Sequence, residues 1–346
     1  NVSITTLHPF FFGFGRNILK ECQMTILVSN ETSFSEQLRN AALARNTRIA
    51  YDKGWRCFSN FCHRQGIQPL NATPEEVANF FIEIAAEPSP ASGKILSLGT
   101  LTLYRSAINR RFLDAHKASP TSHSQVSAVL KGLARLRGGT TRQVKALREH
   151  HIDAMLRECP DTLIGRRDAA FLAIGFAAAL RRSELCNLRV ADIEWVQEGL
   201  MENAHSGIVI HIRKSKTDQY GTGQRVAVPE GKKIRPVARL RNWLRSSGIQ
   251  DGYLFQTMRK NGSLTGSPLH HSDIPRLVKH YVAAIGLNPK DFSAHSLRAG
   301  FVTSAAAHHA RLDKIMEITR HTNPATVMKY IRDADAFTDH AGAAFL

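Results

Sequence analysis

The stretch AHSLRAGFVTSAAAHHARLDKIMEITRHTNPATVMKYIRDAD, residues 294–335, sets polar side chains among apolar residues at helical spacing. His295 and Arg298 are three residues apart, so one helical turn would bring both side chains to the same point. Taken alone, the pair is equally typical of a capped, solvated helix start. Its interpretation therefore depends on the residues that accompany it.

The second half of this stretch predicts a capped helix that carries a tyrosine. His321 is followed by Thr-Asn, which can cap a helix, and Pro324 fits the first helical position. Tyr330 lies about two turns further along. It shares an apolar stripe with Val327, so a core tyrosine is the alternative interpretation when the helix is considered alone.

Two cations stand upstream of this stretch. Arg181 follows the apolar part of a long helix predicted over residues 165–195, and Glu184 lies one turn on, where it could orient Arg181. A surface Arg–Glu pair is the alternative. Lys216 is predicted at or just beyond the end of a strand over residues 207–213, where a hairpin tip could place its ammonium group in a DNA groove. A solvated surface lysine is the alternative there.

Charge indicates the class of partner. The 346 residues include 46 Lys and Arg against 29 Asp and Glu, a net charge of +17. Such a balance favours a polyanionic partner, most often nucleic acid. Basic membrane-surface proteins usually concentrate charge in one tail or helix, whereas here it is spread along the chain. No apolar run approaches the roughly 18 residues of a membrane span.

The fold class is predicted to be mainly α, in two domains. Residues 1–35 are expected to form a poorly ordered arm, and residues 36–137 a bundle of four or five helices with cationic faces. Residues 138–149 are polar and Gly-containing, which predicts a linker. Residues 150–346 are expected to form a mostly helical second domain. Its small antiparallel β-sheet would come from SGIVIHIRKSKT and GQRVAVPE.

Several standard sites are excluded. The sequence has no GxxxxGK[ST] loop, no HExxH motif and no carboxylate cluster suited to two-metal chemistry. The five cysteines are scattered without a CxxC pair, which favours reduced thiols in a cytoplasmic protein. Adjacent histidines are expected to point to different faces of a helix, which makes them poor metal ligands. These pairs are His150–His151, His270–His271 and His308–His309.

The remaining candidates suit phosphate chemistry. Arginine, lysine and histidine donate hydrogen bonds to phosphate oxygens, and preorganised guanidinium groups stabilise the extra charge of a pentavalent phosphoryl species. A tyrosine hydroxyl becomes a nucleophile when a base takes its proton. This chemistry needs no metal, because the arginines stabilise the developing charge.

The motifs resemble those of the tyrosine recombinases, also called phage integrases, and are closest to Cre-type members. LRRSEL is similar to the family's first-arginine motif, AHSLR to its His-x-x-Arg motif, and RHTNPATVMKY to its second histidine and nucleophilic tyrosine. The resemblance covers roughly residues 36–340. Six residues follow the family order: Arg181, Lys216, His295, Arg298, His321 and Tyr330.

The resemblance implies a role for each of these residues. Arg181 and Arg298 would bind the scissile phosphate, and His321 would hydrogen-bond to it. Lys216 would be the general acid that protonates the leaving 5′-oxygen.

The same resemblance assigns the covalent step. Tyr330 would attack the phosphate and form a 3′-phosphotyrosyl bond, His295 would assist its proton transfer, and Glu184 would support the arginines. Because the bond energy is kept in that link, strand exchange would need no ATP, metal or other cofactor.

The resemblance also implies assembly on double-stranded DNA. The N-terminal helices would form a SAM-like core-binding domain, and inverted-repeat recombination sites would each bind a dimer. Two sites would form a tetrameric synapse and exchange strands through a Holliday junction. The tail DAFTDHAGAAFL resembles the helix that docks onto a neighbouring protomer. Cations expected to contact DNA are Arg45, Arg48, Arg56, Arg105, Arg110, Arg111, Lys131, Arg135, Arg142 and Lys145.

Two alternatives stay open at this point. A type IB topoisomerase uses similar chemistry without exchanging partners, and a DNA-binding regulator could keep the fold without catalysis.

The sequence also departs from the family pattern. Arg320 occupies a position where glycine is common, before His321. A prokaryotic or phage origin and an association with the nucleoid are expected.

Overall fold

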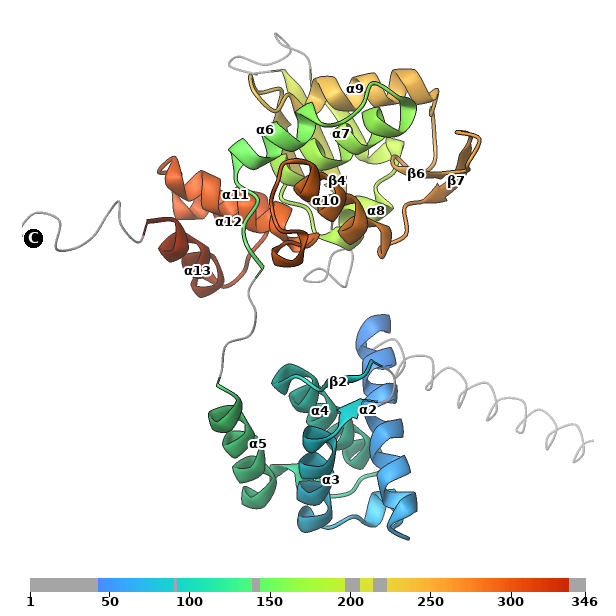
Figure 1. The fold of residues 1–346 in the computed structure, drawn as a ribbon, viewed down its shortest axis with the longest axis vertical. Coiled ribbons are helices and arrows are strands. Elements are labelled where there is room, and N and C mark those ends of the chain that lie inside the picture. Colours follow the sequence, from blue (N-terminus) through green and yellow to red (C-terminus); the bar gives the residue numbers. More distant parts are fainter. Residues whose placement is uncertain (1–42, 90–91, 139–143, 197–205, 214–222, 336–346) are drawn as a thin grey trace, which may run out of the picture. The chain divides into compact units, whose positions relative to one another are not determined.

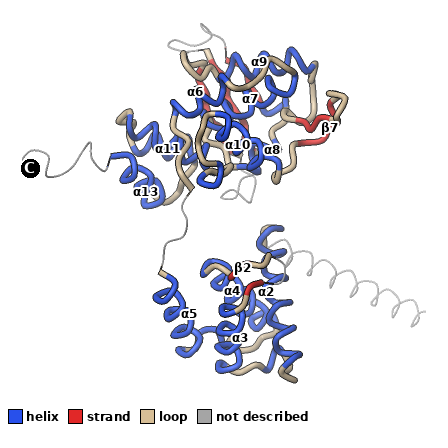
Figure 2. Tube along the Cα trace, viewed as in Figure 1, coloured by secondary structure: helices blue, strands red, loops and turns tan. Residues whose placement is uncertain are grey.

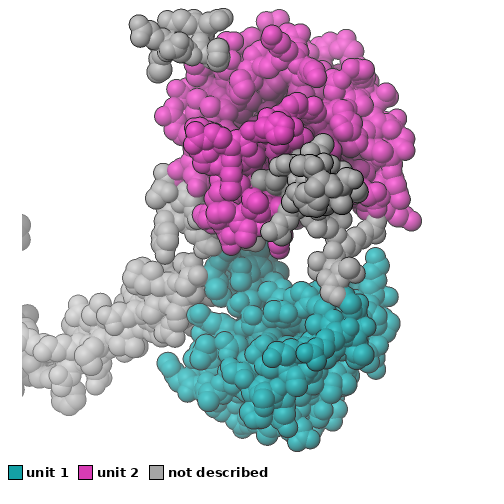
Figure 3. All heavy atoms as spheres, turned by 90° about the vertical axis from the view of Figure 1, so that its left-hand side faces the viewer, with its two compact units in different colours: residues 1–141 teal, residues 142–346 magenta. Residues whose placement is uncertain are grey.

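The computed structural model describes residues 43–89, 92–138, 144–196, 206–213 and 223–335. The chain divides into two compact units, residues 1–141 and residues 142–346 (Figure 3). The division lies inside the segment predicted as a linker. The predicted arm, residues 1–35, and the C-terminal segment, residues 336–346, lie outside the described residues.

Unit 1 is a helical bundle (Figure 1). Thr73 starts one helix with a capping box, in which the Glu76 backbone N–H donates to Thr73 Oγ1 at 3.3 Å and the Thr73 N–H donates to Glu76 Oε2 at 2.7 Å. Its helices and short strands are α2 (Arg45–Arg64), α3 (Pro74–Ala86), α4 (Leu98–Asp114), α5 (Ser124–Arg137), the 3-10 turns Pro69–Asn71 and Pro120–Ser122, and the antiparallel pair β1 (Pro88–Ser89) and β2 (Lys94–Ile95).

Aromatic residues fill the core of unit 1. Phe58 of α2 packs edge-on against Phe80 of α3, with ring centroids 5.1 Å apart, and Phe61 lies 5.5 Å from the same ring. Tyr104 and Ile108 of α4 are also buried. Their spacing leaves the charged residues on the outer faces of the helices.

Unit 2 is mostly helical (Figure 2). It also contains a three-stranded antiparallel sheet in the order β3-β4-β5, which confirms the predicted fold class. Its helices are α6 (Glu149–Arg157), α7 (Leu163–Ala177), α8 (Arg182–Asn187), α9 (Pro236–Ser247), α10 (Asp273–Ala284), α11 (His295–Ala307), α12 (Leu312–Thr319) and α13 (Pro324–Asp335), with 3-10 turns at Val190–Asp192 and Pro289–Asp291. Its strands are β3 (Ile193–Val196), β4 (Gly207–Ile212), β5 (Gln224–Pro229), β6 (Gln256–Met258) and β7 (Leu264–Pro268).

The single helix predicted over residues 165–195 is wrong. Helix α7 ends at Ala177, and Ala179 adopts a left-handed conformation with φ +46°. The Ala179 N–H donates to the Phe176 carbonyl, and the Leu180 N–H donates to the Gly175 carbonyl. These bonds form a Schellman-type helix end, which normally uses glycine. The chain then forms α8, a 3-10 turn and β3, so Arg181 lies in a turn rather than inside a helix.

Helix α11 is the element that positions the site. It contacts α7 and α13, and the chain leading into unit 2 runs tightly along it. A Cβ atom at Gly300 would lie 1.8 Å from the Leu147 carbonyl oxygen, so this approach requires glycine. The Leu147 N–H donates to the Ser296 carbonyl at 3.0 Å. The start of α11 is therefore held from outside the helix.

Candidate active site

Arg298 is the most constrained residue of the site. Its side chain points from α11 into the protein, and the residue is only 2% exposed. One terminal nitrogen donates to the Ala179 carbonyl at 2.7 Å, and the other donates to the Thr319 carbonyl. The left-handed turn after α7 and the end of α12 thus present carbonyl oxygens that hold this guanidinium group in place.

Arg181 is the N-cap residue of α8 and is fixed by Glu184. The Arg181 backbone N–H donates to Glu184 Oε2, and its guanidinium group donates to Oε1, both at 2.8 Å. The Glu184 side chain is 2% exposed, whereas that of Arg181 is 19% exposed. The carboxylate is therefore buried behind Arg181, whose guanidinium group remains accessible.

His321 is oriented by partners on both ring nitrogens. Arg298 can only donate, so its contact with His321 Nε2 at 3.2 Å makes that nitrogen the acceptor. The Thr319 hydroxyl donates to the Ile315 carbonyl at 2.6 Å, so its oxygen accepts from His321 Nδ1 at 2.8 Å. These partners assign the Nδ1–H tautomer.

Tyr330 and His295 form the other contact that a covalent step would require. The Tyr330 hydroxyl lies 2.9 Å from His295 Nε2. Helix α13 begins at Pro324, and Asn323 Oδ1 accepts from the Ala325 N–H at 2.9 Å, which confirms the predicted cap. Val327 is fully buried, so it anchors the helix while the half-buried Tyr330 reaches the site.

The environment keeps both histidines neutral near pH 7. Burial, followed by the charges of Arg298 and Arg181, lowers the pKa of His295 below its usual value. The same causes lower the pKa of His321 to about 4. Burial and the charge of Arg181 lower the pKa of Arg298 to about 9, so it stays cationic. A neutral His295 can accept the proton of the tyrosine hydroxyl.

Arg320 adds a third guanidinium group that was not among the predicted site residues. It is 7% exposed, and one terminal nitrogen donates to Glu184 Oε2 at 2.7 Å. Its backbone has φ +57° at the end of α12. The only signal for it in the sequence was an arginine at a position where the family often has glycine. The left-handed backbone itself could not be predicted from the sequence.

Hydrogen bonds join Arg181 to Glu184, Arg298 to His321 and His295 to Tyr330. Because the charges of Arg298 and Arg181 both act on His295, these groups form one site, which includes five of the six predicted residues and Glu184. Lys216 lies outside the described residues. Tyr330 also lines a hollow of about 320 Å³ beside Lys145 and Arg148, so cations flank the candidate nucleophile.

The cations expected to contact DNA fall into different environments. Arg105 is half-buried and donates to the Thr121 carbonyl at 3.0 Å, which gives it a structural role. Ion pairs with neighbouring carboxylates involve Arg110, Arg111 and Lys145. Arg142 lies outside the described residues. The exposed members are Arg45, Arg48, Arg56, Lys131 and Arg135.

The described residues hold no group of three His, Cys, Asp or Glu side chains that could bind a metal ion. The expectation that adjacent histidines point to different faces is wrong for two pairs. The ring centroids of His150 and His151 lie 4.0 Å apart, and those of His270 and His271 lie 3.9 Å apart, so the two rings of each pair lie on the same side of the chain.

Among the helices that the structure describes, none has the length and apolarity of a bilayer span.

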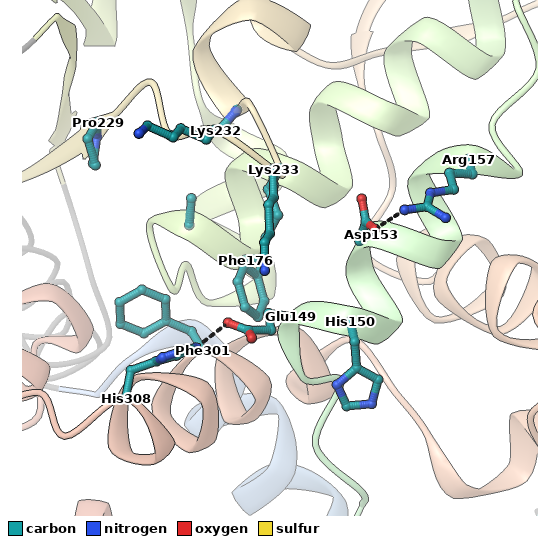
Figure 4. Close-up of a pocket in the computed structure, with 14 residues that line it drawn as sticks. Glu149, His150, Asp153, Arg157, Phe176, Pro229, Lys232, Lys233, Phe301 and His308 are labelled. Atoms are coloured by element: carbon teal, nitrogen blue, oxygen red, sulfur yellow. Dashed lines mark hydrogen bonds and ion pairs between the residues drawn. The ribbon is translucent and has the colours of Figure 1, made fainter.

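A second hollow, of about 890 Å³, lies elsewhere in unit 2 (Figure 4). Phe176 and Phe301 meet edge-on in its wall, with ring centroids 6.0 Å apart. Glu149 pairs with His308 at 2.8 Å. The lining also includes Lys232 and Lys233 from the loop after β5, together with His150, Asp153, Arg157, Ala177, Pro229, Gly231, Ile234 and Pro236.

Comparisons with known proteins agree with this geometry. Residues 145–336 match the model of the phage integrase family. The chain is 31% identical over 302 residues to an integrase/recombinase xerD homolog of Selenomonas ruminantium, covering 86% of this chain and 84% of the relative.

Solved structures share the fold at lower identity. The Tn1549 transposon integrase in complex with transposon right-end DNA aligns with TM-score 0.59 and 16% identity, over 88% of this chain and 96% of that one. A lambda integrase dimer bound to a COC′ core site aligns with TM-score 0.57 and 18% identity, over 90% and 97%.

Proposed function

Because this chain belongs to the phage integrase family, and is a tyrosine site-specific DNA recombinase, we propose that Tyr330 is the nucleophile that cuts each DNA strand. The observation that carries the proposal is the 2.9 Å contact between the Tyr330 hydroxyl and His295 Nε2. It joins a potential nucleophile to a neutral base in a site that also holds buried arginines.

In the proposed reaction, Tyr330 Oη attacks phosphorus and its proton passes to His295. The bond from phosphorus to the 5′-oxygen breaks, and a 3′-phosphotyrosyl ester forms. Arg181 and Arg298 would bind the phosphate oxygens, since the extra negative charge of the pentavalent species strengthens these contacts. In this step, the phosphate would replace His321 as the acceptor for Arg298.

Lys216 would donate the proton to the leaving 5′-oxygen. A 5′-hydroxyl from another strand then attacks the phosphotyrosyl ester and releases Tyr330, so bonds broken and formed balance without ATP. Two such exchanges would pass through a Holliday junction.

Double-stranded DNA with inverted-repeat sites is the proposed substrate. The exposed arginines of α2 give unit 1 a cationic face suited to phosphate contacts, which position the protein without reading sequence. The protein would work on nucleoid DNA in the cytoplasm.

We propose that a dimer binds each site and a tetramer forms the synapse. In this assembly, residues 336–346 of one protomer would occupy the second hollow of its neighbour (Figure 4). The segment AFTDHAGAAFL is small and apolar with one aspartate. The aromatic wall and Lys232 suit those two features. Phe301→Glu should lower the assembly size on DNA, measured by sedimentation, and unchanged assembly would contradict the docking.

The central test is covalent trapping. The substrate is a duplex that is selected for binding from a random-sequence pool and is nicked, so that the fragment released by cleavage diffuses away. It should form a covalent adduct with the wild-type protein. Tyr330→Phe should bind the same duplex with similar affinity and form no adduct. An adduct that persists in Tyr330→Phe would overturn the assignment of the nucleophile.

Two further outcomes separate the alternatives. Relaxation of supercoiled plasmid that lacks the selected site would indicate a topoisomerase. Specific binding without adduct in the wild-type protein would indicate a regulator without catalysis.

A further inference from the structure

Arg320 occupies a backbone position that suits glycine. Its φ of +57° and ψ of +42° are left-handed, and its N–H closes α12 by donating to the Met316 carbonyl at 2.7 Å. A side chain in this conformation costs about 1 kcal/mol relative to glycine. The backbone conformation alone would therefore favour glycine at position 320. The presence of arginine must be explained by the contacts of its side chain.

The side chain completes an ion pair behind the phosphate-binding face. Arg320 donates to Glu184 Oε2 at 2.7 Å and to the Ile318 carbonyl at 2.9 Å. Glu184 also accepts from the backbone and guanidinium group of Arg181, each at 2.8 Å. One buried carboxylate is thus shared by two guanidinium groups. The Arg320 and Glu184 side chains are 4% and 2% exposed, so solvent screens neither charge well.

The sharing changes the charge available to a phosphate. With neutral histidines, Arg181, Arg298 and Arg320 carry +3 against one carboxylate, a net charge of +2. Without Arg320 the net charge would be +1, and Glu184 would act on Arg181 alone. A phosphodiester carries one negative charge and its pentavalent form carries two. The third arginine therefore raises the positive charge of this cluster by one unit, which favours the more highly charged species.

We propose that Arg320 is a positioning residue that neutralises Glu184, so that the charge of Arg181 stays available to the phosphate under attack. The proposal rests on the role of Arg181 in the proposed function. Because Arg320 is buried behind Arg181, its loss should slow the cleavage step and leave DNA affinity nearly unchanged. If Arg320 had a purely structural role, removing the charge of Glu184 would not restore cleavage in an Arg320 variant.

The test is charge compensation in single-turnover cleavage of the selected nicked duplex by the full chain. Arg320→Gly removes the guanidinium group and relieves the left-handed strain. It should slow adduct formation about 10- to 100-fold, less than the 10²- to 10³-fold cost of removing a direct donor. Arg320→Lys keeps the charge and should recover part of that loss.

The decisive variant is Arg320→Gly combined with Glu184→Gln. Glutamine keeps an oxygen for the Arg181 N–H but removes the negative charge, which restores the net charge of +2. This double variant should cleave at least fivefold faster than Arg320→Gly, with an effect on cleavage rather than on Kd. No recovery, or wild-type cleavage by Arg320→Gly, would overturn the proposal.

Thermal melting of each variant separates misfolding from lost chemistry. If Arg320→Gly does not fold, the comparison of Arg320→Lys with Arg320→Asn decides. Lysine keeps the charge and should cleave faster than asparagine, and equal rates in the two variants would overturn the proposal. The proposed function has its own indicator, an adduct in wild type that Tyr330→Phe lacks. Its failure would be seen before any Arg320 variant is compared.

Discussion

The cations of unit 1 and those of the unit 2 site use opposite physical strategies. In unit 1, Arg45, Arg48 and Arg56 project from α2 into solvent. In unit 2, Arg298 is 2% exposed and bonded to two backbone carbonyls. Exposed charges act through a field that salt screens and contribute nearly independently. Buried charges act at short range, and each depends on the others.

The largest expected effect comes from removing the general base of the unit 2 site. His295→Gln removes the group that accepts the tyrosine proton, so adduct formation should fall about 10²- to 10⁴-fold. His280→Gln, an exposed histidine of α10, is the matched control and should cleave normally. Quenched-flow measurement of the adduct checks both variants, and a normal rate in His295→Gln would exclude it as the base.

The pH dependence sharpens the same point. His295 acts in its neutral form, and its pKa is lowered below the usual value near 6.5. Cleavage should therefore be at full rate at pH 7. On the acid side, it should decline once the pH falls below 6.5 and passes through the lowered pKa of His295. An acid limb centred above pH 6.5 would contradict the effect of burial. The His295→Gln variant should lack this limb.

Arg298→Lys should have the next largest effect. Lysine cannot donate to the Ala179 and Thr319 carbonyls in the fixed geometry of a guanidinium group, although it keeps the charge. Cleavage should fall about 10²- to 10³-fold, and Tm should fall because a buried carbonyl loses its donor. Arg276→Lys, whose side chain is 79% exposed, is the control. Equal activity of the two variants would refute the distinction between buried and exposed cations.

Arg48→Ala tests the exposed half of the comparison. It should weaken DNA binding severalfold on all sequences and lower the slope of log K against log salt by about 0.9. Adduct formation from bound complex should be unchanged. Arg64→Ala is the control, because Glu83 already pairs with Arg64. A selective loss of affinity for one DNA sequence would instead assign Arg48 to base contacts.

The smallest effect is expected at the cap of α13. Asn323→Ala removes the oxygen that accepts from the Ala325 N–H and should cost about 1 kcal/mol of stability. Because Val327 still anchors the helix, cleavage should slow less than tenfold. Denaturant unfolding and the adduct assay together check this. A larger loss of rate than of stability would mean that the cap places Tyr330 directly.

Regular patterns in the sequence predicted the periodic parts of the fold. The Asn323 cap and the two strands β4 and β5 follow from local rules, and the structure confirms them. The break after α7 does not follow from local rules. Ala178, Ala179 and Leu180 are good helix formers, so tertiary contacts must have overridden their propensity.

Arg298 supplies one such contact, because its bond to the Ala179 carbonyl joins residues 119 positions apart in sequence. The same limit applies to Arg320. Its partner Glu184 is 136 residues away, so neither the ion pair nor the left-handed backbone was predictable. The six candidate residues and the Glu184 partner of Arg181 were predicted from the motifs, but the carbonyl acceptors of Arg298 and the contacts of Arg320 were not.

The close approach of Leu147 to Gly300 has a mechanical consequence. The Lys145 N–H bonds to the Asp291 carbonyl, and the Leu147 N–H bonds to the Ser296 carbonyl. The chain therefore enters unit 2 strapped to the first turn of α11, between His295 and Arg298. A force on residues 145–147 would therefore act on this turn before it reaches the rest of the core. It would displace His295 and Arg298 together.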